Sequence, residues 1–143
     1  MGSVPLDDIV AAIRRSEREH GREALTNLER WLLEGCNLEA YALHQGGFDY
    51  YLAHIDGPEA WADASAALYA MELEDAAAVV RRAVELFLAT DGGGADPSGM
   101  RNYLDQMDGL DRAFAGLVPD LETSLARFAD RFYPFADRGP PSG

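Results

Sequence analysis

The sequence has 143 residues, of which 48% are hydrophobic and 26% are charged, proportions typical of one globular domain and not of a disordered chain. All twelve basic residues are Arg, against 25 Asp and Glu, so the net charge of −13 argues against direct binding to nucleic acid or to anionic membranes. We see neither an export signal nor an apolar run of about 18 residues that could span a membrane, and the single cysteine, Cys36, allows no intrachain disulfide. We therefore expect a cytoplasmic protein.

The negative charge is concentrated in the middle third of the chain. Residues 1–30 carry a net charge of −1 and residues 81–143 carry −3, whereas residues 31–80 carry −9 because they contain nine acids and no base. Acidic residues favour solubility, so one interpretation of this segment is a well-solvated surface. The other is a docking face for a basic partner, because carboxylates at i, i+4 on a helix stand about 5–6 Å apart, and two adjacent acidic helices approximate a stretch of duplex backbone.

The N-terminal quarter is predicted to form two amphipathic helices. Apolar residues at i, i+3, i+4 and i+7 indicate a first helix that ends near Gly21, and similar spacing indicates a second helix from Arg22 to Gly35. We expect Gly35 to end that second helix and Asn37 to cap the next one.

Residues 38–55 organise the rest of the prediction, because two helical apolar faces meet there at a glycine pair. One face precedes Gly46 and Gly47, and the same spacing restarts at Phe48 and Tyr51. The glycines suit a break at which one residue has positive φ or a neighbouring element comes close. We interpret the stretch as helix, break, helix, with Gln45, Gly46, Gly47, Phe48 and Tyr51 as a structural motif.

The second half continues with helices separated by turns. Pro58 suits the first turn of a helix, and an interruption at residues 72–74 precedes an alanine-rich helix over residues 75–89. Residues 91–99 are rich in glycine and are predicted to form a flexible loop. Beyond this loop we expect helices over residues 100–107, 108–117 and 119–132.

No segment alternates apolar and polar residues over the length of a strand, so the predicted class is all-α. We expect a single compact domain of about six to eight helices over residues 1–135. Its N-terminal helices would lie in residues 1–36 and its core in residues 37–135. Residues 136–143, which include Gly-Pro-Pro-Ser-Gly, are predicted to be a disordered tail.

Candidate catalytic and metal-ligating residues are few and lack a recognised spacing. His44 and His54 lie on either side of the glycine pair, and no His-x3-His or Cys-x2-Cys pair is present. Cys36 follows a turn glycine without a nucleophile signature. The aspartates between positions 105 and 111 share a helix face but do not match a calcium loop. We predict no catalytic residue, no cofactor and no metal.

The central stretch resembles a family of small helical bacterial proteins named after a DNA-mimic protein. The family hallmark is Asn-Asn-Gly-Gly-Phe followed by aromatic residues and an Asn, which corresponds here to His44-Gln45-Gly46-Gly47-Phe48, then Tyr51 and His54. The similarity extends over roughly residues 38–135. This chain departs from the hallmark at three positions, because His44 and Gln45 replace the two asparagines before the glycines and His54 replaces the later one. Gln45 keeps a side-chain amide.

The resemblance implies an all-α fold and a non-enzymatic protein that occupies the DNA-binding surface of a regulator. With the charge distribution, it predicts a non-enzymatic acidic interaction protein whose partner is a basic protein surface, such as that of a DNA-binding protein. The predicted partner-binding residues are acids of the middle third: Glu39, Asp49, Asp56, Glu59, Asp63, Glu72, Glu74 and Asp75.

Two alternatives and one question of assembly stay open. An immunity or antitoxin-type protein would neutralise a basic nuclease through a similar acidic surface. A small-ligand or enzyme domain around the glycine pair would use His44, His54 and Tyr51 in a concave pocket, which requires the side chains to converge. The sequence does not decide whether the chain forms a homodimer.

Overall fold

The structure is a computed structural model that describes residues 5–55, 57–90 and 96–132. These residues form seven α-helices, a 3₁₀ turn (η1) and a π-helix (η2), without a strand among them. The predicted all-α class and the predicted number of helices are confirmed. In chain order the elements are α1 (Leu6–His20), η1 (Arg22–Ala24), α2 (Asn27–Leu38), η2 (Glu39–Leu43), α3 (Gly47–His54), α4 (Pro58–Ala70), α5 (Glu74–Thr90), α6 (Pro97–Leu117) and α7 (Leu121–Phe132).

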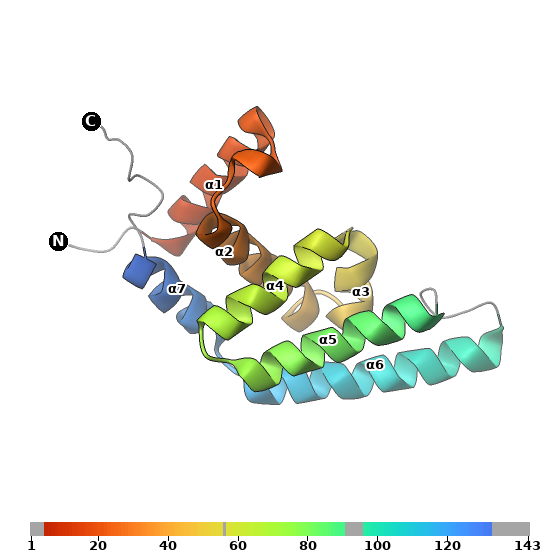
Figure 1. The fold of residues 1–143 in the computed structure, drawn as a ribbon. Helices are drawn as coiled ribbons and strands as arrows, with labels where there is room; N and C mark the ends of the chain where they lie inside the picture. The colour runs from red at the N-terminus through yellow and green to blue at the C-terminus, as the bar shows by residue number, and fades with distance from the viewer. Residues whose placement is uncertain (1–4, 56, 91–95, 133–143) are drawn as a thin grey trace, which may run out of the picture.

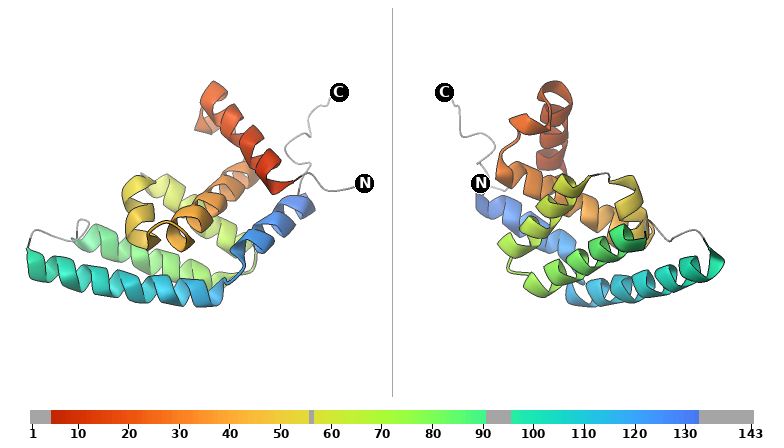
Figure 2. Two further views of the ribbon diagram at one scale, coloured as in Figure 1. Left: turned by 180° about the vertical axis from the view of Figure 1, so that it is seen from behind. Right: turned by 45° about the vertical axis from the view of Figure 1, so that its right-hand side comes forward.

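The helices pack around a central pair formed by α2 and α4 (Figure 1). Helix α5 packs on α4 and runs beside α6 as a long antiparallel hairpin, while α3 contacts both α5 and α6. Helix α7 covers the other side of α2. Helix α1 leans away from the body and contacts α2 and α7, as the two rotated views in Figure 2 also show. No described helix has the length and apolar character needed to cross a membrane.

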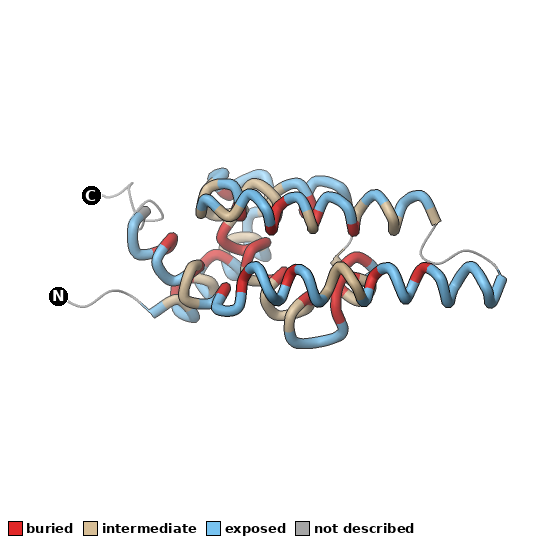
Figure 3. Tube along the Cα trace, turned by 90° about the horizontal axis from the view of Figure 1, so that it is seen from below, coloured by how far each residue is buried: buried red, intermediate tan, exposed pale blue. Residues whose placement is uncertain are grey.

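The core lies where the inner faces of these helices meet (Figure 3). Phe48 and Tyr51 of α3 are fully buried, as the predicted structural motif requires. The Phe48 ring meets Phe114 of α6 edge-on, with ring centroids 5.1 Å apart. This aromatic contact adds to the free energy of burying both rings and fixes the start of α3 against α6.

The second helix differs from its prediction at both ends. It begins at Asn27, because Thr26 and Glu29 form a capping box: the Thr26 hydroxyl accepts from the Glu29 N–H, and the Glu29 carboxylate accepts from the Thr26 N–H. It also continues through Gly35 to Leu38. A Cβ at position 35 would lie 2.7 Å from the side chain of Leu125 on α7, so this glycine permits close helix packing inside the helix instead of ending it. Asn37, the predicted cap, is a buried residue within the same helix.

The turn between α4 and α5 confirms the predicted interruption and gives its mechanism. Glu72 is the one described non-glycine residue with positive φ, at 63°. Its N–H donates to the Tyr69 carbonyl, and the Leu73 N–H donates to the Leu68 carbonyl. This pair of bonds is a Schellman motif, which satisfies the last carbonyls of α4 before α5 begins.

The helix after α5 differs from its prediction in two respects. Helix α6 is continuous from Pro97 to Leu117, whereas the sequence predicted a break near Asp108 and a loop up to Gly99. The Asp96 carboxylate accepts from the Gly99 N–H at 2.7 Å and caps the helix. The Asp108 carboxylate bonds to Arg112 one turn later, which suits a helix interior. Residues 91–95 of the predicted loop and the predicted tail lie outside the described residues.

Candidate functional site

The glycine pair joins η2 to α3 and is held by a carboxylate of α6. Gly47 has a φ of 81°, in the left-handed region. Asp111 accepts a hydrogen bond from the Phe48 N–H at 2.8 Å, so it caps α3 from a different helix. A Cβ at position 47 would lie 2.2 Å from Asp111 Oδ2. Both the backbone angle and the available space therefore require glycine here, whereas the neighbouring Gln45 is exposed.

A second carboxylate ties α3 to α6 on the same interface. The Tyr103 hydroxyl donates to Asp49 at 2.6 Å, and burial together with this bond raises the pKa of Tyr103. Burial also raises the pKa of Asp111, and the nearby Asp108 and Asp49 carboxylates add to that increase, which the Phe48 N–H opposes. Asp49, a predicted partner-binding residue, thus contributes to helix packing.

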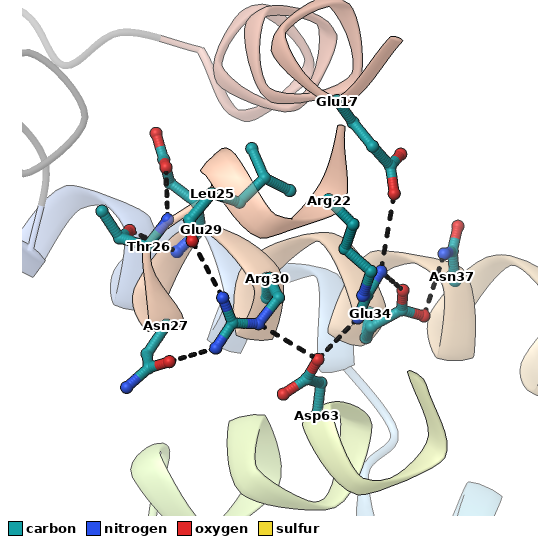
Figure 4. Close-up of polar contacts among 10 residues, drawn as sticks. All are labelled: Glu17, Arg22, Leu25, Thr26, Asn27, Glu29, Arg30, Glu34, Asn37 and Asp63. Atoms are coloured by element: carbon teal, nitrogen blue, oxygen red, sulfur yellow. Dashed lines mark hydrogen bonds and ion pairs between the residues drawn. The ribbon is translucent and has the colours of Figure 1, made fainter. Parts of the chain in front are cut away.

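Five polar residues from η1, α2 and α4 form a network of hydrogen bonds and ion pairs (Figure 4). We call it the Arg22 cluster; its members are Arg22, Arg30, Glu34, Asn37 and Asp63. Arg22 Nη1 lies 2.8 Å from Glu34 Oε2, and Arg22 Nη2 lies 2.5 Å from Asp63 Oδ2. Arg30 Nε lies 3.4 Å from the same Asp63 oxygen, and Asn37 Nδ2 donates to Glu34 Oε1 at 3.1 Å. Two of the nine middle-third acids are therefore paired with arginines from the N-terminal segment.

Glu34 is the most buried charge of the cluster, with 2% of its surface exposed. Burial raises the pKa of the Glu34 carboxyl, and hydrogen bonds from Asn37 and Arg22 only partly oppose this effect. Burial alone would lower the pKa of Arg22, but the bonds to Glu34 and Asp63 outweigh it and raise that pKa. The buried Tyr51 hydroxyl has no hydrogen-bond partner among the described residues.

The predicted partner-binding acids occupy different environments. Glu39 is partly exposed and its carboxylate lies 2.6 Å from His44 Nε2. Asp49 and Asp63 belong to the internal contacts given above, and Asp56 lies outside the described residues. The remaining four predicted acids are exposed, and their carboxylates form no hydrogen bond or ion pair with a described residue: Glu59, Glu72, Glu74 and Asp75.

The four exposed acids lie near the two ends of α4. Glu59 is in its first turn, whereas Glu72, Glu74 and Asp75 follow its last residue. A helix of this length spans about 20 Å at 1.5 Å per residue. Glu59, Glu74 and Asp75 also stand in the first turns of α4 and α5, where carboxylates favour the positive end of the helix dipole.

A family model described as DMP19-like protein matches residues 23–132. The chain belongs to this family. Comparison with curated proteins and comparison with solved structures each gave no match. The matched region contains the glycine pair, Asp111 and four members of the Arg22 cluster, but it begins one residue after Arg22 itself. In this DMP19-like protein, α1 and the arginine that joins α2 to α4 therefore lie outside the family match.

A cleft of about 710 Å³ opens between α1, α2 and the start of α4 in this DMP19-like protein. His54 lines the cleft, but His44 does not, and the buried Tyr51 ring does not reach it. His44 contacts Glu39, whereas His54 Nδ1 bonds to the Tyr50 carbonyl. The convergence that the small-ligand alternative requires is thus not present. Among the described residues, no group of three or more His, Cys, Asp or Glu side chains is placed to hold a metal ion.

Sequence reasoning missed the Arg22 cluster, although one signal for it was present. Glu34 stands three residues after Trp31 and four before Leu38, so it occupies the apolar face of α2. A carboxylate at such a position needs a buried cation or hydrogen-bond donors. The sequence does not show which arginine supplies the charge, because Arg22 reaches Glu34 from a separate 3₁₀ turn.

Cys36 is mostly buried, and burial raises the pKa of its thiol to about 12, so thiolate chemistry at neutral pH is disfavoured.

Proposed function

We propose that this protein acts by binding, without catalysis, and that its partner is a basic protein surface such as the DNA-contacting surface of a DNA-binding protein. The family membership supports this proposal, because the resemblance to the DNA-mimic family implies a protein that competes with DNA. The distribution of unpaired carboxylates supports it independently.

The observation that carries the proposal is the difference between paired and unpaired acids in residues 31–80. Arginines of the N-terminal segment neutralise Glu34 and Asp63 inside the molecule. By contrast, no described arginine forms an ion pair with Glu59, Glu72, Glu74 or Asp75. Exposed single-sign charge of this kind attracts an oppositely charged partner over a distance set by the ionic strength.

The proposed interface therefore comprises the acids that face solvent and omits those that hold the fold together. Glu59, Glu72, Glu74 and Asp75 form its exposed part, and Glu39 contributes beside His44. Because such charges act mainly on the rate of association, we expect binding to weaken steeply as salt is raised. Asp49 and Asp63 serve the packing of α3 and α4.

The test compares two variants that lose the same number of charges. The first replaces the four exposed acids near α4, as Glu59→Gln, Glu72→Gln, Glu74→Gln and Asp75→Asn. The second replaces four exposed acids elsewhere, as Asp7→Asn, Asp8→Asn, Asp105→Asn and Glu122→Gln. Each protein is immobilised and exposed to a lysate of its source organism at low and high salt. Captured proteins are then identified, purified and tested for direct binding.

We expect the wild type and the second variant to bind a basic DNA-binding protein that duplex DNA displaces, and the first variant to lose it. Equal binding by both variants would show that the overall charge of the protein, and not the position of these four acids, determines the interaction. If the wild type retains no basic protein at low salt, the proposal is wrong. Capture of a nuclease whose toxicity is suppressed by co-expression would instead support the immunity-type alternative.

A further inference from the structure

Three aromatic side chains form a continuous row beside the glycine pair. The ring centroids of Tyr41 in η2 and Tyr50 in α3 are 5.7 Å apart, and those of Tyr50 and His54 are 3.9 Å apart in a stacked arrangement. We call this row the aromatic ladder. The π-helix η2 and the start of α3 bring it together, because Tyr41 and Tyr50 lie on opposite sides of the glycine break. Single π-helical turns of this kind are frequent at functional sites.

The ladder is at the surface and its hydroxyls are unused. Tyr41 and Tyr50 are half-buried and His54 is exposed, and neither tyrosine hydroxyl makes a hydrogen bond with a described residue. The buried Tyr103, by contrast, donates to Asp49. Tyrosines that expose an apolar body and a free polar tip are enriched at protein interfaces.

The His54 end of the ladder presents a hydrogen-bond acceptor. The Tyr50 carbonyl can only accept, so its 2.9 Å contact with His54 Nδ1 places a proton on that nitrogen. In the neutral imidazole, Nε2 then keeps its lone pair. His54 also lines the cleft at the start of α4, so a donor that enters the cleft meets this side chain.

The charges around the ladder favour a cationic donor. Glu59 lines the same cleft as His54 and forms no ion pair with a described residue, and Glu39 belongs to the same π-helix as Tyr41. The cleft is lined by two cations, Arg14 and Arg22, and by three carboxylates, those of Glu17, Glu34 and Glu59. Arg22 is matched by the carboxylates of its cluster, and Arg14 donates to the neutral Asn37 Oδ1 at 3.0 Å, so the lining as a whole stays negative.

We propose that the aromatic ladder binds arginine side chains of the basic partner. A guanidinium is planar, stacks on aromatic rings and carries several N–H donors, so it can stack on the exposed His54 end of the ladder and donate to Glu59, which lines the same cleft as His54. A lysine ammonium can pair with the carboxylate but does not stack in the same way. This inference rests on the proposed function and adds a preference for arginine over lysine.

The test uses fluorescein-labelled octa-arginine and octa-lysine, titrated with the protein at low salt and followed by fluorescence anisotropy. We expect the wild type to bind octa-arginine about three- to fivefold more tightly, the size of an exposed cation–π contact. Tyr50→Leu keeps the apolar bulk and should bring the ratio of the two affinities to about one. His54→Phe keeps a ring but removes Nε2, so it should reduce the ratio partly. Tyr69→Leu, at an exposed tyrosine outside the ladder, should leave the ratio unchanged.

The outcomes separate this inference from the proposed function. Equal binding of both peptides by the wild type would overturn the inference and leave the acidic-interface proposal standing. A Tyr50→Leu variant that keeps the arginine preference, or that weakens both peptides equally while remaining folded by circular dichroism, would also overturn it. If neither peptide binds at low salt, the proposed function is wrong as well.

Discussion

Gly47 and Asp111 form the residue-level contact that allows α3 to begin where it does. We expect Gly47→Ala to lower the free energy of unfolding, because a φ of 81° is strained for alanine and its Cβ would meet Asp111 Oδ2. The left-handed conformation alone costs about 1–2 kcal/mol, and the displaced Asp111 would no longer cap α3. Urea unfolding followed by circular dichroism measures the change.

Gly109→Ala is the matched control for this prediction. Gly109 lies inside α6, and nothing stands within 4 Å of a Cβ added there. Alanine is the better helix former, so this substitution should stabilise the protein by about 0.5–1 kcal/mol. If both substitutions change stability in the same direction, the role given to the Gly47 conformation is wrong.

At the level of elements, Arg22 joins α2 and α4 and also approaches α1, where Glu17 lies 3.5 Å away. Arg22→Ala would leave the Glu34 carboxylate buried without its cation. Breaking one half of a buried pair costs about 3–5 kcal/mol, and we expect the lower end of this range because the Arg22 side chain is 26% exposed. Thermal and urea unfolding measure the loss. Arg15→Ala, at an exposed position on α1, should have little effect.

The double variant Arg22→Met with Glu34→Leu tests the reason for that loss. If the cost comes from an unpaired buried charge, replacing both partners by apolar side chains should recover most of the stability. A double variant no more stable than Arg22→Ala would show instead that the ion pair itself contributes the free energy.

The elements predicted correctly and incorrectly differ in the range of the interactions that define them. Periodicity and turn residues are local, so they predicted α4 from Pro58 and the interruption at Glu72. Gly35 was misjudged because its role depends on Leu125, which only the tertiary structure brings to α2. The break predicted near Asp108 failed because a side chain suited to capping also suits a helix interior when it pairs with Arg112. The Arg22 cluster could not be predicted from the sequence, because its members come from three separate elements that only the tertiary structure brings together.

Considered as a whole, the molecule combines internal charge neutralisation with an external excess of acids. Four acids position helices: Glu34 and Asp63 in the Arg22 cluster, and Asp49 and Asp111 at the α3–α6 interface. The whole chain has a net charge of −13, and the repulsion among its acids opposes the compact state. Residues 31–80 therefore contain two kinds of acid: those that hold the fold together and those that are exposed at the surface.

The raised pKa values of two buried acids predict how the free energy of unfolding depends on pH. Burial raises the folded-state pKa of Glu34 and Asp111 above their ordinary values of 4.5 and 3.8. Between the ordinary and the raised pKa, the folded protein binds more protons than the unfolded chain, so stability falls as pH rises through this interval. The contribution of both groups is therefore more favourable below the interval than at neutral pH.

We expect the free energy of unfolding to increase as pH is lowered from neutral towards the ordinary carboxyl pKa, with relief of charge repulsion acting in the same direction. Urea unfolding at a series of pH values measures this slope. The variant Glu34→Gln with Asp111→Asn keeps hydrogen-bonding side chains but removes both titrations, so its slope should be shallower than that of the wild type. Asp105→Asn removes an exposed carboxylate and should leave the slope nearly unchanged. A double variant with the full wild-type slope would show that neither buried carboxyl controls this dependence.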